Sequence, residues 1–135
     1  MKSTKELITN IRRMKSRKDL FGEDYSKIEL SSYLKEQMKE HHLKPKDLIV
    51  RLNMEKSYLY QILKGRRVPS RDFLIRFAVL IRMNVDETQR LLSIAGRQPL
   101  YPRNRGDAAI IYAITHRMSL EEYQDFIDTL ENTDE

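Results

Sequence analysis

The feature that most constrains the fold is a pair of short helical patterns joined by a tight turn between Pro45 and Gly65. Pro45 suits the first turn of a helix, because its missing N–H would have no partner there, and this first pattern ends near Leu52. The second pattern covers residues 56–64, and Gly65 after it readily adopts the left-handed conformation that ends helices. Asn53 lies in the turn, and asparagine tolerates that conformation better than most residues. The sequence therefore predicts two helices separated by a sharp turn of about three residues.

The rest of the chain also shows helical periodicity, and we expect an all-α protein. No stretch alternates apolar and polar residues convincingly, as a half-buried strand would. Ser70 is expected to cap one helix, Asn84 or Asp86 to open the next, and Ser119 with Glu122 to form a capping box for the last. We expect breaks at residues 20–24 and 99–102. The expected helices cover residues 4–18, 29–41, 45–52, 56–64, 71–81, 85–95, 107–116 and 120–130.

Length and composition fit one compact unit with short appendages. The chain has 135 residues, of which 40% are hydrophobic and 33% charged, and it contains no cysteine, which excludes disulfides and thiolate metal sites. No run approaches the roughly 18 apolar residues that a membrane span needs, so we expect a cytoplasmic protein without a membrane partner. We expect a basic N-terminal arm over residues 1–27, a central domain over 28–97 and a helical extension with an acidic end over 98–135.

Charge is distributed unevenly along the chain. The net charge is +5, but residues 41–71 alone carry eight Lys and Arg against two acids, whereas residues 119–135 carry seven acids and no base. A basic stretch is either a solvated face or a surface for a polyanion such as nucleic acid. Charge alone leaves both interpretations open.

The second helix of the pair divides its residues by face. Leu59, Ile62 and Leu63 have the spacing of a buried stripe, and Tyr58 is also expected in the core. The opposite face gathers Lys56, Ser57, Tyr60, Gln61 and Lys64. All five side chains can bond to base edges or phosphates. Because the N-terminal half of a helix in the major groove meets the bases, the expected base contacts are Lys56, Ser57, Tyr60 and Gln61. The expected phosphate contacts are Lys46, Lys64, Arg66, Arg67 and Arg71.

These motifs resemble the Cro/repressor-type helix-turn-helix family, also called XRE-like. The resemblance rests on Leu48…Leu52-Asn53, Ser57-Tyr58-Leu59-Tyr60-Gln61-Ile62, Gly65…Arg67…Pro69-Ser70 and Leu91-Leu92…Ala95-Gly96. It implies a five-helix module beginning near Glu29, double-stranded DNA as the partner, and a homodimer active in transcriptional control. Residues 87–105 resemble a bacterial subgroup extended by C-terminal helices. Pro45 departs from the family pattern, which commonly has glutamine there, and so does Ile49, where a small residue is common.

Other functional classes have weaker support in the sequence. No catalytic triad order, phosphate-binding glycine loop or metal motif is present, so we expect neither enzymatic activity nor a cofactor. The alternative function is a protein-interaction adaptor built on a helix-turn-helix frame, with the acidic C-terminal helix as a surface for packing, dimerisation or another protein. Residues 103–105 are expected either to touch DNA or to cap and pair at the next helix. The basic N-terminal segment is open between a backbone-gripping arm, a docked interface and partial disorder.

Overall fold

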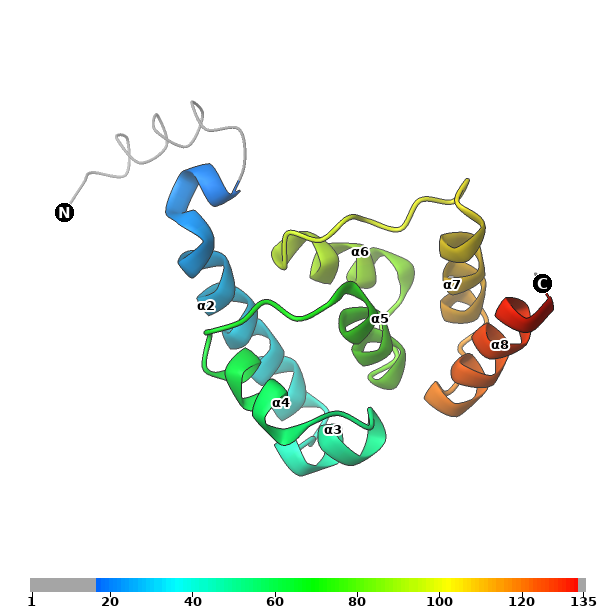
Figure 1. The fold of residues 1–135 in the computed structure, drawn as a ribbon, viewed down its shortest axis with the longest axis horizontal. Helices are drawn as coiled ribbons and strands as arrows, with labels where there is room; N and C mark the ends of the chain where they lie inside the picture. Colours follow the sequence, from blue (N-terminus) through cyan, green and yellow to red (C-terminus); the bar gives the residue numbers. More distant parts are fainter. Residues whose placement is uncertain (1–16, 134–135) are drawn as a thin grey trace.

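The computed structural model describes residues 17–133, which form seven helices and no strand (Figure 1). The helices are α2 (Arg17–Glu40), α3 (Pro45–Arg51), α4 (Lys56–Leu63), α5 (Arg71–Leu80), α6 (Val85–Ile94), α7 (Arg105–Thr115) and α8 (Leu120–Thr133). The expected all-α fold is therefore confirmed. The helix expected over residues 4–18 lies almost entirely outside the described residues. Among the described residues, no helix is both long and apolar enough to span a bilayer.

The first described helix is longer than the sequence predicted. We expected a break at residues 20–24 and a helix start at 29, and both expectations were wrong, because α2 runs without interruption from Arg17 to Glu40. Gly22 and the acids after it suggested the break. A single glycine costs a helix only about 1 kcal/mol, however, and no proline interrupts this stretch. The boundary expected between residues 27 and 28 falls inside this helix.

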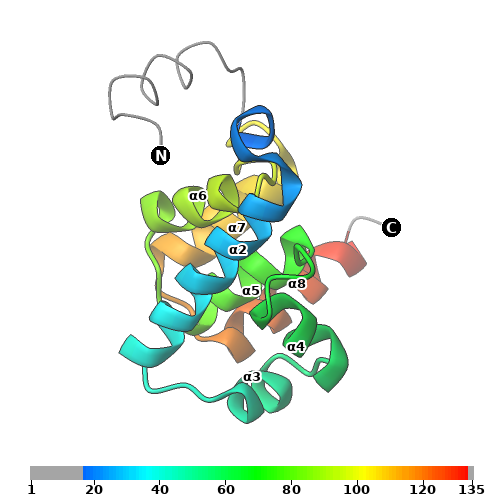
Figure 2. The ribbon, with the colours of Figure 1, turned by 90° about the vertical axis from the view of Figure 1, so that its left-hand side faces the viewer.

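The core forms around α5, which packs against α6 and α8, while α2 packs against α4 and α6 (Figures 1 and 2). Phe77 of α5 is completely buried, and so are Leu30 of α2 and Leu59 and Ile62 of α4. Full burial of such side chains contributes about 1.5–3 kcal/mol each. The apolar stripe predicted for α4 is thus the surface that fixes this helix to the body of the protein.

Helix ends follow the predicted signals. Asn53 and Gly65 have positive φ, at 49° and 72°, which confirms the expected left-handed turns, and Gly96 after α6 also has a positive φ of 67°. Ser70 Oγ accepts from the backbone N–H of Phe73 at 3.1 Å. The next helix opens at Asn84, whose side chain and that of Glu87 form a reciprocal capping box. The box at Ser119 and Glu122 is also present.

The segment after α6 is built into the same core as the preceding helices. Leu100, Ala113, Ile114, Leu120 and Tyr123 all belong to the buried cluster that contains Phe77. Gln89 of α6 holds the extended segment before α7 in place, because its side-chain amide donates to Leu100 O at 2.8 Å and accepts from Leu100 N at 2.7 Å. Arg97 reaches back to Pro69 O at 3.0 Å. The hydrophobic core therefore continues across the boundary that we expected at residues 97/98.

Candidate nucleic-acid interface

The turn between α3 and α4 is fixed from both sides. Leu48 of α3 and Leu52, the residue directly after this helix, are buried in the core. The turn closes with backbone bonds from Asn53 N to Val50 O and from Met54 N to Ile49 O. Arg76 of α5 supports it from the core side, with Nη2 donating to Leu52 O at 2.6 Å. The angle between the two helices is thereby set by packing and hydrogen bonds.

The outward face of α4 is open to solvent. All five side chains that the sequence placed on it are exposed: Lys56, Ser57, Tyr60, Gln61 and Lys64. Lys56 Nζ lies 5.8 Å from the centre of the Tyr60 ring. The first turn of α4 contains no acid. These five side chains form an exposed ridge of hydrogen-bonding and cationic groups on α4, on the side opposite to its buried apolar stripe.

Tyr58 connects this ridge to the core. Its side chain was expected in the core and is half-buried, and its ring meets Phe73 edge-on at 6.5 Å. Its hydroxyl oxygen accepts from Ser70 N at 2.9 Å. The loop between α4 and α5 is therefore tied to α4 through this tyrosine.

Arg67 in that loop bends back over α4. Its guanidinium carbon lies 4.7 Å from the centre of the Tyr58 ring, and its Nη1 donates to Gln61 Oε1 at 3.3 Å. The sequence placed Arg67 among the phosphate contacts and gave no sign of this contact. Gln61 lies in α4 and Arg67 lies six residues later, beyond the end of that helix, so helical spacing does not predict their contact. The conformation of the loop brings the two side chains together.

The remaining residues expected to contact phosphates divide into two groups. Lys46, Lys64 and Arg66 are exposed. Arg71 is turned inward instead. Its Nε donates to Gln98 O at 2.9 Å, its Nη2 donates to Pro99 O at 3.1 Å, and both terminal nitrogens bond Asp107. The guanidinium of Arg71 thus joins α5 to the C-terminal extension, and its expected phosphate contact stays a prediction.

Asp107 is the buried acid that receives Arg71. Burial by itself raises the pKa of its carboxyl group, but hydrogen bonds from Arg71 and from Tyr101 N outweigh that effect, and the net pKa lies below the usual value. The preceding Asn104 caps α7 by accepting from Asp107 N at 2.9 Å. Of the two interpretations left open for residues 103–105, the structure shows capping at Asn104.

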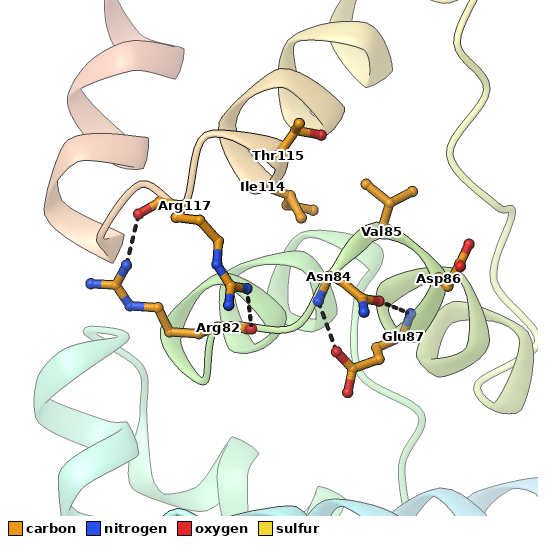
Figure 3. A pocket seen from close by; sticks show the side chains of 8 residues that line it. All are labelled: Arg82, Asn84, Val85, Asp86, Glu87, Ile114, Thr115 and Arg117. Carbon is orange, nitrogen blue, oxygen red and sulfur yellow. Dashed lines mark hydrogen bonds between the residues drawn. The ribbon is translucent and has the colours of Figure 1, made fainter.

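A separate open pocket of about 520 Å³ lies between the α5–α6 turn and the end of α7 (Figure 3). Arg82 Nη1 donates to Arg117 O at 2.7 Å, and Arg117 Nη1 donates to Arg82 O at 3.1 Å. Both arginines lie at the end of a helix and have positive φ, at 64° and 55°. Through the two hydrogen bonds, each side chain satisfies the backbone carbonyl of the other arginine. Asn84 and Glu87 in the same wall bond each other. These polar residues of the pocket wall thus bond to one another or to helix ends, and none of the lining residues belongs to α3 or α4.

Among the described residues, no three His, Asp or Glu side chains are grouped to hold a metal ion.

Comparison with known proteins agrees with this geometry. Residues 29–91 match the model of a family described as a helix-turn-helix domain. The "ImmF control region 10 kDa protein" of Bacillus phage phi105 is 37% identical over 57 residues, which cover 42% of this chain and 63% of that protein. The chain therefore spans less than two thirds of that relative's length. No solved structure matches the chain. Over residues 29–91 the chain is therefore similar to an XRE-like helix-turn-helix domain.

Proposed function

We propose that this protein is a sequence-specific regulator of transcription that binds double-stranded DNA with α4 in the major groove. The observation that carries the proposal is the exposed ridge of α4, where five hydrogen-bonding side chains stand together on a helix fixed to the core. The major groove admits an α-helix and presents donors and acceptors that differ for each base pair. The name of the phage relative, a control region protein, fits a regulator as well.

The ridge separates into base-reading and backbone-binding parts. Lys56, Ser57, Tyr60 and Gln61 occupy the first two turns of α4, which lie deepest in the groove when a recognition helix docks. Lys46, Lys64 and Arg66 flank them as exposed cations and are proposed to bind phosphates on either side of the groove. Contacts of this second kind position the protein without carrying sequence information.

A homodimer completes the proposal. Two copies related by a twofold axis would read two half-sites, whose centres lie about 10 base pairs or a multiple of that distance apart. Sedimentation of the protein with a selected duplex of that spacing tests the stoichiometry, and a single copy on a two-half-site duplex contradicts the dimer.

The direct test selects preferred duplexes from a random library and measures affinity for the best one. Gln61→Ala is expected to cost about 1–3 kcal/mol on the preferred duplex and little on unrelated DNA, because a base contact discriminates between sequences. Gln124→Ala on α8 is the matched control and should change neither value, since Gln124 lies on an exposed face of another helix. If Gln61→Ala left the preference unchanged, the base-reading role of α4 would be wrong.

The phosphate contacts have a different signature. Lys64→Ala and Arg66→Ala should each weaken binding to every sequence and reduce the slope of log affinity against log salt by about 0.9 for each phosphate that the protein no longer neutralises. Titration of a labelled duplex at several salt concentrations measures that slope. An unchanged slope in both variants would contradict the assignment.

The second candidate function is a protein-interaction adaptor, and the acidic helix α8 is the observation that favours it. Its exposed acids are Glu121, Glu122, Asp125, Asp128 and Glu131. Such a face repels DNA and attracts a basic partner. An adaptor predicts no salt-sensitive duplex binding by the wild-type protein, so the same titration decides between the two functions.

A further inference from the structure

The contact between Arg67 and Gln61 changes what the recognition helix offers to a base. A free glutamine amide presents one acceptor oxygen and an NH₂ donor, which is the pattern that pairs with adenine N6 and N7. In this structure, Oε1 of Gln61 already accepts from Nη1 of Arg67 at 3.3 Å. One of the two lone pairs of Oε1 is thereby used, while the Gln61 NH₂ and the remaining N–H groups of the guanidinium are all donors, so donors outnumber acceptors at this pair.

Arg67 is held in this place by more than one contact. Its guanidinium stacks on Tyr58 at 4.7 Å, and a cation over a tyrosine ring contributes at exposed sites as well as buried ones. Tyr58 is fixed in turn by Phe73 and by the N–H of Ser70. A swing of Arg67 toward a phosphate would give up both the stacking and the bond to Gln61. The side chain is thus set in advance beside the base-reading residues.

A positively charged surface on which donors outnumber acceptors discriminates between bases. Guanine presents two acceptors in the major groove, N7 and O6, whereas adenine presents the N7 acceptor beside the N6 amino donor. An adenine amino group would meet the N–H groups of Arg67, which repel it. We propose that Arg67 is a positioning residue that makes Gln61 select guanine rather than adenine. This inference rests on the proposed function, since it concerns the same ridge of α4.

The experiment compares duplex preferences of four proteins selected from the same random library: wild type, Arg67→Ala, the double variant Gln61→Ala/Arg67→Ala, and Arg66→Ala. The wild type should prefer guanine over adenine about tenfold at one position of its site. Arg67→Ala frees Gln61 Oε1, so the preference at that position should move toward adenine by about tenfold. The double variant should lose the preference, because the adenine contact needs the amide.

Arg66→Ala is the matched control, as the neighbouring exposed arginine of the same loop. It should weaken all duplexes alike and keep guanine at that position. Arg67 is itself exposed, and circular dichroism of each variant verifies that the fold is intact. A wild-type preference for adenine, or an Arg67→Ala variant that behaves like Arg66→Ala, would overturn the positioning role and leave the proposed function standing. Absence of salt-sensitive duplex binding by the wild type would overturn both.

Discussion

Removal of residues 98–135 is expected to abolish the stable fold of the remaining chain, although the match to the helix-turn-helix family ends at residue 91. The deleted part supplies Leu100, Ile114, Leu120 and Tyr123 to the common core. At about 1.5–3 kcal/mol for each buried side chain, their loss removes roughly 6–12 kcal/mol. The total stability of a small protein is about 5–15 kcal/mol. The truncated protein should therefore lack a cooperative thermal transition and expose apolar surface.

Thermal unfolding followed by circular dichroism measures this effect, with dye binding as a second signal for exposed apolar surface. The matched control removes only residues 131–135, of which 131 and 132 are exposed, and it should unfold like the full chain. A truncated protein that unfolds cooperatively within a few degrees of the full chain would contradict the prediction. It would show instead that residues 28–97 form the separate domain that the sequence suggested.

The orientation of α4 could be predicted from the sequence, because the spacing of apolar residues within one short helix shows which face is buried. Leu59 and Ile62 recur at helical spacing, and once they are buried the polar residues between them must face outward. Helix ends were predictable for a similar reason, since capping by Ser70 or a left-handed Asn53 depends on chemistry within a few residues. These features need no knowledge of distant parts of the chain.

The contacts of individual arginine side chains could not be predicted, because several partners are possible for each of them. Arg66, Arg67 and Arg71 look alike in the sequence, as three arginines close together in one basic stretch. In the structure they differ: Arg66 is exposed, Arg67 stacks on Tyr58, and Arg71 is bonded to Asp107, 36 residues away. The start of α2 was predicted wrongly because Gly22 was interpreted as a helix break, although one glycine costs a helix only about 1 kcal/mol. Long-range packing and ion pairs override such local signals.

The pair formed by Arg71 and Asp107 shows how the C-terminal extension is joined to the helix-turn-helix domain. The two side chains meet at 2.9 Å, and the Asp107 side chain is only 12% exposed. Asp107 also accepts from Tyr101 N at 2.9 Å, so one carboxylate holds α5, the loop before α7 and α7 itself. Asp107→Asn should destabilise the protein by about 2–3 kcal/mol at neutral pH, because it removes charge-assisted hydrogen bonds and leaves the guanidinium of Arg71 without a carboxylate partner. Chemical denaturation measures this free energy.

The same pair predicts a pH dependence whose sign follows from the direction of the pKa shift. The folded state lowers the pKa of Asp107 below its usual value of 3.8, so the unfolded chain takes up this proton more readily as the pH falls. The contribution of Asp107 to stability is therefore complete above about pH 5 and is lost as the pH falls through the folded pKa, below 3.8. The stability difference between wild type and Asp107→Asn should shrink over that acidic range, whereas Asp125→Asn, on the exposed face of α8, should follow the wild type throughout. A difference that stayed constant from neutral pH to below about pH 3 would mean that packing of the side chain, and not its ionised pair with Arg71, holds the extension in place.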